Sequence, residues 1–220
     1  MKIEQRVLSS KLSKMKGIVP KRDNMPVLQG VLVSDGWMTA TNLQLTIKAR
    51  IHGIDPGERL VIPLDAFDLI AGLPEGDVEI TEKDGNIIIR TDMIENEFSS
   101  IPPEQFPSSG YVLKEGNAVM SALDLQQKLS NVLWAVSKKD ARPTVRSLYI
   151  ECKDGTANFV GLDGHTIAWD TLPYEGDVSL LIPRDCIEQL LRLDMKGDVK
   201  ILHDRMHSAF VQRIMSLKPG

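Results

Sequence analysis

The sequence has no apolar run near the ~20 residues that a helix needs to cross a bilayer, and its polar start does not resemble a signal peptide. It has only two cysteines, Cys152 and Cys186, which are too few for a disulfide framework. Both lie in apolar segments, so we expect buried, unreactive thiols. Together these absences predict a cytoplasmic protein that does not bind membranes.

Groups that could form a metal site are scarce. The segment His203-Asp204-Arg205-Met206-His207 is similar to the zinc motif H-E-x-x-H, with Asp in the Glu position. That motif requires a helix, so that both histidines share a face, and here it lies between two strand-like segments. No third ligand is apparent. The sequence therefore predicts no metal and no cofactor.

Catalytic groups are equally sparse. Asp163-Gly164-His165 has no accompanying nucleophile or glycine-rich phosphate loop, so we expect it to form a turn rather than a catalytic dyad. The tryptophans Trp37, Trp134 and Trp169 are scattered and do not form a pattern typical of a base-stacking platform. The sequence predicts a protein that is not an enzyme. A metal-dependent enzyme built on His203 and His207 is the enzymatic alternative.

The sequence does contain a long internal duplication. Lys11-Leu12-Ser13 returns as Lys128-Leu129-Ser130, Ile62-Pro63 as Ile182-Pro183, and Gly76–Ile80 as Gly197–Ile201. The offset drifts from 117 to 121 residues, as small loop insertions would cause. A repeat of this length predicts two similar domains, 1–112 and 113–220, with the Pro- and Ser-rich segment 102–112 as the linker.

Periodicity predicts the same order of elements in each half. The first half opens with an apolar helical stripe, which the second half repeats 117 residues later: Leu8, Leu12, Met15 and Val19, then Leu125, Leu129, Val132 and Val136. Short alternating strands follow, at 29–34, 37–40 and 44–50 and at 145–152, 156–160 and 166–172. A second helix begins near Pro63 and Pro183, and further strands follow at 78–81, 86–90 and 97–101 and at 199–203 and 208–214. This order predicts an α+β fold, with two helices packed on antiparallel sheets in each domain.

Charge is distributed unevenly along the chain. The formal net charge is −4, but residues 1–22 hold seven Lys or Arg and one acid, and residues 126–146 hold five against Asp140. The first helix and the loop after it are therefore basic in both halves. An acidic body with a basic stripe suits a polyanion that touches one face, while the plainer interpretation is two solvated helix faces.

Several ordered motifs of the chain match one known family. Arg22–Leu28 fits the pattern R-x-x-x-P-[IV]-L, Thr39–Leu45 is similar to T-A-T-D-L-E-L, and Gly161–Ala168 is similar to A-T-D-G-H-R-L-A. These motifs resemble the beta sliding clamp family of bacterial DNA polymerase III. The further segments that fit are Val61-Ile62-Pro63, Leu73–Gly76, Phe106-Pro107, Arg142-Pro143, Ile182-Pro183-Arg184 and Arg213-Ile214-Met215. The resemblance covers essentially the whole chain.

The resemblance implies two tandem DNA-clamp domains of a six-domain ring, with helices lining a hole through which duplex DNA passes without sequence-specific contact. A sparse basic lining suits sliding, because exposed phosphate contacts are weak and screened by salt. By resemblance, DNA-facing roles fall to Arg22 and Lys139, supported by Lys11, Lys21, Lys128, Lys138 and Arg142.

The family also has a pocket for apolar peptides of polymerases and clamp loaders, between its second and third domains. The matching positions here are Val145, Leu162, Gly164, His165, Thr166, Ile167 and Pro219, where Leu162 replaces Thr and Thr166 replaces Arg. The usual third domain has no counterpart in this chain, so we expect weakened peptide binding.

The family's subunit-interface strand usually reads basic-x-basic-Phe, whereas here Glu95-Asn96-Glu97-Phe98 is acidic. If the chain is complete, six domains require a homotrimer, with a new complementary face on the second domain. The leading hypothesis is a sliding-clamp-type processivity factor that encircles duplex DNA and tethers replication proteins. The alternative is a clamp-like paralogue or fragment that binds replication partners without forming such a ring.

Overall fold

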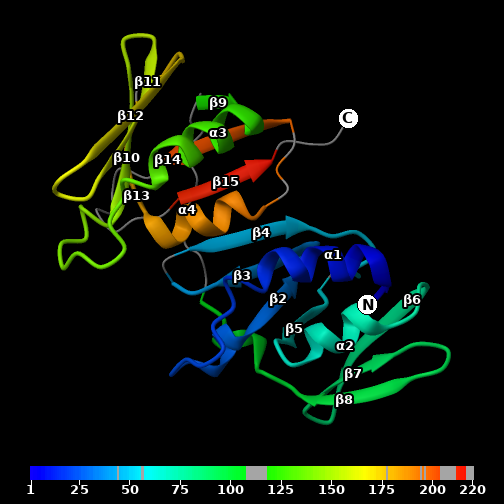
Figure 1. The fold of residues 1–220 in the computed structure, drawn as a ribbon. Coiled ribbons are helices and arrows are strands. Elements are labelled where there is room, and N and C mark those ends of the chain that lie inside the picture. Colours follow the sequence, from blue (N-terminus) through cyan, green and yellow to red (C-terminus); the bar gives the residue numbers. More distant parts are fainter. Residues whose placement is uncertain are drawn as a thin grey trace. The chain divides into compact units, whose positions relative to one another are not determined.

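The computed structural model describes residues 1–43, 45–55, 57–107, 118–176, 178–193, 195, 197–203 and 212–216. The chain divides into two compact units, Met1–Ser109 and Gly110–Gly220 (Figure 1). The boundary predicted at residues 112 and 113 lies outside the described residues. In its described residues each unit combines antiparallel sheets with two helices, so the predicted α+β class is confirmed. Among the described residues, no helix is long and apolar enough to cross a membrane.

The first unit contains two four-stranded antiparallel sheets. One has the order β1-β6-β7-β8, formed by Lys2–Glu4, Asp77–Lys83, Asn86–Arg90 and Glu95–Ser99. The other has the order β4-β3-β2-β5, formed by Thr46–Arg50, Trp37–Thr41, Gly30–Ser34 and Arg59–Pro63. The helices are α1 (Gln5–Met15) and α2 (Ala66–Gly72), which pack against each other, and the 3₁₀ turns are η1 (Pro26–Gln29) and η2 (Pro103–Gln105).

The second unit repeats this plan in its described part. A four-stranded sheet has the order β12-β11-β10-β13, formed by Ile167–Pro173, Thr156–Leu162, Ser147–Lys153 and Val178–Pro183. A three-stranded sheet has the order β15-β14-β9, formed by Gln212–Ser216, Asp198–His203 and Ala118–Ser121. The helices are α3 (Ala122–Leu133) and α4 (Arg184–Leu191).

The opening helices form where the apolar stripes predict them. Leu8, Leu12 and Met15 are buried on α1, and Leu125, Leu129 and Val132 are buried on α3. Val19 and Val136 continue each stripe just past the helix end and are also buried. At the start of α3, Ser121 Oγ accepts a hydrogen bond from the amide of Asp124, as an N-cap residue does. These stripes tie each helix to the core of its unit.

Matching backbone hydrogen bonds occur in the two halves. The amide of Gln5 donates to Gly76 O at 2.9 Å, and the amide of Ala122 donates to Gly197 O at 2.8 Å. The segment before each second helix is fixed in the same way, because Leu64 N donates to Gln29 O and Arg184 N donates to Arg146 O. The two halves therefore share one backbone plan.

Four short strands were not predicted. β1 and β9 have only three and four residues, too few to show an alternating pattern. β5 and β13 end in Ile62-Pro63 and Ile182-Pro183, which the sequence marks only as helix starts. Pairing across the chain forms all four: β1 joins β6, β9 joins β14, β5 joins β2 and β13 joins β10.

The segment around Pro26 forms the 3₁₀ helix η1, which buries Val27 and Leu28. The predicted linker needs correction, because its first residues are not free. Phe106 packs with Val27, Leu28 and Val61, and Arg59 Nη2 donates to Pro103 O at 2.9 Å. Residues 102–107 therefore belong to the first unit, because an apolar side chain anchors them there.

Candidate nucleic-acid interface

A dibasic turn follows α1. Ile18 and Val19 are buried directly before it, and Lys21 and Arg22 are exposed. The Oδ1 atom of Asp23 accepts a hydrogen bond from the amide of Met25 at 2.8 Å, which closes the turn. The two cations are thus presented between a buried apolar anchor and a hydrogen-bonded turn.

The equivalent turn follows α3. Ala135 and Val136 are buried, and Lys138 and Lys139 are exposed. The Oδ1 atom of Asp140 accepts a hydrogen bond from the amide of Arg142 at 2.8 Å, the same arrangement as at Asp23, 117 residues earlier. We call residues 21–25 and 138–142 the two dibasic turns. The same local chemistry builds both.

The second dibasic turn carries an additional ion pair. The guanidinium of Arg142 donates to both carboxylate oxygens of Asp140, at 3.0 and 2.9 Å. This pairing holds the pKa of Asp140 at about 2, well below its usual value. Because its charge is compensated locally, Arg142 contributes less net positive charge than Lys138 and Lys139.

Lys11 and Lys128 occupy equivalent helix positions in different surroundings. The Lys128 Nζ atom lies 2.7 Å from Asp170 Oδ1 on β12, so an acid of the same unit already compensates its charge. The opposite carboxylate draws it onto the sheet. Lys11 is half-buried, and burial, together with the nearby Lys14, lowers its pKa. Neither is as accessible as the dibasic turns.

Other cations of the first basic segment are also paired with acids. Lys2 bonds Asp77 at 3.2 Å, Lys16 bonds Asp68 at 2.5 Å, and Arg6 bonds Glu75. Within the described part of the chain, no side-chain hydrogen bond or ion pair is found for four exposed cations of the predicted DNA-binding set: Lys21, Arg22, Lys138 and Lys139. The dibasic turns therefore carry uncompensated positive charge.

The turn between β11 and β12 contains three of the seven predicted peptide-pocket positions. Asp163 Oδ1 accepts from the amides of His165 and Thr166, at 2.9 and 2.7 Å, and these bonds lower the pKa of Asp163. Asp163 therefore stabilises a turn, as predicted. Gly164 has a φ of 94°, and a Cβ built on it would lie 3.5 Å from Arg142 Nη2. The second dibasic turn thus lies beside this β-turn.

Two of the other described pocket positions flank this turn. Leu162 and Ile167 are exposed at its two ends, whereas Val145 is buried. Pro219 lies outside the described residues. The structure therefore brings Leu162, Gly164, His165, Thr166 and Ile167 together on one short hairpin.

The predicted interface strand, β8, lies at the edge of its sheet. Glu95 pairs with Arg90 on β7 at 2.5 Å, and Glu97 Oε2 lies 3.5 Å from Asn86 Nδ2. The register places Lys2, Glu79, Arg90 and Glu95 side by side on adjacent strands, so charges alternate across the sheet and end in an acid. Phe98 is half-buried.

Among the described residues, the thiols and histidines form no catalytic constellation. Cys152 and Cys186 are both buried and free, and burial raises the pKa of each thiol to about 11. Such thiols are poor nucleophiles near neutral pH. In the described ranges no three His, Cys, Asp or Glu side chains are grouped as a metal site would require. The residues 204–207 of the candidate metal motif lie outside those ranges.

Comparison with known proteins identifies the family. Residues 1–110 match the family model for the N-terminal domain of the DNA polymerase III beta subunit. The chain belongs to the DNA polymerase III beta subunit family. Among curated relatives of this family, the beta sliding clamp of Pseudomonas aeruginosa is 26% identical over 223 residues, and that of Salmonella typhimurium is 23% identical over 202 residues. These relatives are sliding clamps, not enzymes.

The chain is shorter than the relatives it matches. The alignment with the Pseudomonas aeruginosa clamp covers 93% of this chain but 60% of that protein. Solved structures agree with the clamp fold. The Pseudomonas aeruginosa beta subunit superimposes with a TM-score of 0.84 at 23% identity, covering 91% of this chain and 58% of that one. A beta subunit from Eubacterium rectale gives 0.85 at 17% identity, covering 98% and 62%.

Sequence reasoning missed the acids that organise the candidate interface. Asp23 and Asp140 follow the two dibasic pairs at the same offset of 117 residues, so the repeat itself carried that signal. Asp170 carried no comparable signal, since its pairing with Lys128 depends on β12 lying beside α3.

Proposed function

We propose that this chain acts as a sliding-clamp-type processivity factor, which encircles duplex DNA without sequence specificity and tethers replication proteins in the cytoplasm. The observation that carries the proposal is the pair of dibasic turns, built alike in both units of a clamp-family chain. Four exposed cations, two in each turn, provide a sparse phosphate-facing surface. Such a surface attracts a duplex and still exchanges phosphates quickly, as sliding requires.

The DNA-facing role of these turns is tested with a charge-matched pair of variants. Arg22→Ala/Lys139→Ala removes one cation from each dibasic turn, and Lys83→Ala/Lys153→Ala removes one exposed cation from each unit elsewhere. We expect the first variant alone to weaken duplex binding and to lower the slope of log K against log salt by about two. Equal effects of the two variants in fluorescence anisotropy titrations would reject the assignment.

Encirclement is tested separately with topologically closed DNA. A ring remains on a duplex whose ends are blocked by streptavidin, at a salt concentration that abolishes phosphate contacts, and leaves when the ends are freed. Sedimentation velocity gives the oligomeric state, with a homotrimer expected if these two units are the full complement. A strict monomer that does not remain on blocked DNA would reject the ring. Polymerase and clamp-loader peptides are the proposed partners at Leu162–Ile167.

A second candidate is a clamp-like paralogue or fragment that binds replication partners without encircling DNA. The acidic edge strand β8 favours it, since Glu95 and Glu97 stand where the family resemblance expects basic residues. The chain also spans only about 60% of the length of the curated clamp from Pseudomonas aeruginosa. Retention of a polymerase or loader peptide in pull-downs, together with loss from blocked DNA, would select this candidate.

A further inference from the structure

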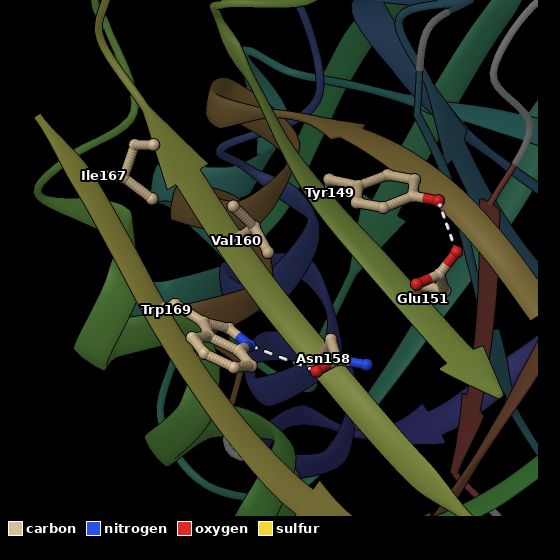
Figure 2. A pocket seen from close by; sticks show the side chains of 6 residues that line it. All are labelled: Tyr149, Glu151, Asn158, Val160, Ile167 and Trp169. Atoms are coloured by element: carbon tan, nitrogen blue, oxygen red, sulfur yellow. Dashed lines mark hydrogen bonds between the residues drawn. The ribbon is translucent and has the colours of Figure 1, made fainter. Parts of the chain in front are cut away.

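The open face of the β12-β11-β10-β13 sheet carries an unusual amount of apolar surface. The opposite face buries Leu148, Ile150 and Phe159, and an antiparallel sheet with one solvated face is normally polar on that side. Here Ile167 is 67% exposed and Trp169 is 69% exposed. A shallow groove of about 330 Å³ runs between strands β10, β11 and β12 (Figure 2), lined by Tyr149, Glu151, Asn158, Val160, Ile167 and Trp169. We call these six residues the open-face groove.

Strand register arranges the groove in two rows. Tyr149, Val160 and Trp169 are directly opposite one another on adjacent strands and form an apolar row. Glu151 and Asn158 form a polar row beside it. The rows are two residues apart along each strand, which corresponds to about 7 Å. A ligand that contacts both rows must therefore present an apolar and a polar group at that separation.

The groove side chains are held in place by hydrogen bonds. The indole Nε1 of Trp169 donates to Asn158 Oδ1 at 3.1 Å, and the Tyr149 hydroxyl donates to Glu151 Oε1 at 3.1 Å (Figure 2). Ser179 Oγ donates in turn to the Tyr149 hydroxyl at 3.1 Å. Fixed aromatic rings lose little conformational entropy when a partner binds. Ordering these side chains therefore costs little of the free energy that their burial contributes to binding.

The charge of the groove indicates the partner's charge. Glu151 is the one ionisable acid among the six lining residues, and no ion pair links it to any cation in the described part of the chain. It is half-buried beside the apolar row. A lysine or arginine suits this position, because its apolar stem can cover the row while its head group bonds the carboxylate. The same carboxylate disfavours nucleic acid phosphates here.

We propose that the open-face groove binds an extended peptide with an aromatic or aliphatic residue two positions from a lysine or arginine. The apolar side chain packs on Val160 between Tyr149 and Trp169, and the cation bonds Glu151. Side chains two residues apart in an extended peptide lie on one side at about 7 Å, which matches the spacing of the rows. The groove shares only Ile167 with the predicted peptide pocket, and its occupancy does not depend on encirclement of DNA.

The test uses fluorescein-labelled, capped heptapeptides with the cores Phe-Thr-Lys and Lys-Thr-Phe, titrated into the full chain and followed by anisotropy. At least one order should bind, and the cores Phe-Thr-Glu and Ala-Thr-Lys should bind about tenfold more weakly, as loss of one charge-assisted or apolar contact predicts. Trp169→Ala and Glu151→Gln should each weaken the best peptide about tenfold. Trp134→Ala, which removes another exposed tryptophan of the same unit, should have no effect.

A charge exchange separates recognition from loss of folding. Glu151→Lys should lose the Phe-Thr-Lys peptide and gain the Phe-Thr-Glu peptide, with an unchanged unfolding midpoint. Peptide binding that is indifferent to Trp169→Ala and Glu151→Gln would overturn the proposal, as would no binding of either order at millimolar concentration. Self-association of the chain that Trp169→Ala abolishes would also overturn it, since the occupant would then be a second copy. None of these three results bears on whether the chain is retained on end-blocked DNA.

Discussion

The helix–sheet junctions of the two units differ although their backbones correspond. In the second unit α3 packs directly on β11 and β12, and Lys128 and Asn131 both bond Asp170. In the first unit the position of Asp170 is taken by Ala49, since Met38↔Ala49 and Phe159↔Asp170 are equivalent register pairs. α1 is instead joined to α2 and the turn after it, by Gln5 to Ile70 O, Lys16 to Asp68 and Arg6 to Glu75.

Two residues of the second unit explain the closer junction. Gly161 lies directly beneath α3, and a Cβ there would overlap the carbonyl oxygen of Val132, whereas the equivalent residue of the first unit is Ala40. Arg184 donates to the carbonyl oxygens of Leu133 and Val136 at the end of α3, and its counterpart is Leu64. The comparison teaches that a duplicated backbone can be stabilised by different side chains in its two copies.

Gly161→Ala should have the largest effect on stability among the changes that distinguish the two units. The added methyl group meets backbone rather than a movable side chain, so α3 must shift away from β11, and we expect a loss of about 3 kcal/mol in the free energy of unfolding. Ala40→Gly in the first unit should cost only about 1 kcal/mol. Urea denaturation followed by circular dichroism measures both, and an equal cost for both changes would contradict close packing at Gly161.

Arg184→Met should have the next largest effect. Its side chain is only 11% exposed, and its removal leaves the carbonyl oxygens of Leu133 and Val136 without these hydrogen bonds. We expect a loss of about 2 kcal/mol in the free energy of unfolding. Arg192→Ala, an exposed arginine beyond α4, serves as the control and should change that free energy by less than about 0.5 kcal/mol.

Asp170→Asn should remove the charge from the Lys128 pair at a cost of about 1 kcal/mol at neutral pH. The hydrogen bond from Lys128, followed by that from Asn131, lowers the pKa of Asp170 in the folded state. The stabilisation is therefore present above the carboxyl's ordinary pKa of about 4 and lost as the pH falls through the lowered value. Unfolding curves of the two proteins should converge at acidic pH. A constant difference from neutral to acidic pH would rule out an ionic contribution.

Leu43→Gly should give the smallest effect and the opposite sign. Leu43 has a φ of 68° in the turn between β3 and β4, where the second unit has Gly164 with a φ of 94°. Glycine relieves the left-handed strain but adds unfolded-state entropy, so we expect a gain of about 0.5 kcal/mol. Gly164→Leu is the reciprocal change and should destabilise the chain. Thermal unfolding of both variants measures the two changes in stability. A lower unfolding midpoint for Leu43→Gly would contradict the expected gain.

Local patterns predicted much of this fold. The stripes around Leu8 and Leu125 identified α1 and α3, and the alternating segments 29–34 and 37–40 identified β2 and β3. The strands β1 and β9 escaped prediction because three or four residues carry no period, and only their partners β6 and β14 hold them.

The candidate interface was likewise predictable in part. Lys21, Arg22, Lys138 and Lys139 stand out as repeated charge in the sequence alone. Which cations are already neutralised did not follow from the sequence, because Asp170 is 42 residues from Lys128 and Asp68 is 52 residues from Lys16. Ion pairs between distant segments depend on the completed fold, whereas the turns at Asp23 and Asp140 are local.

The acidic side chains of the edge strand β8 have a consequence for crowded solutions. If two identical molecules paired their β8 strands antiparallel about Glu97, the two Glu97 carboxylates would face each other across the new seam, and like charges directly opposite destabilise a strand pair. A solvent-exposed sheet margin is otherwise prone to fibrous stacking. The acidic margin therefore protects the protein from polymerising with itself, while it stays receptive to a strand that brings lysine or arginine.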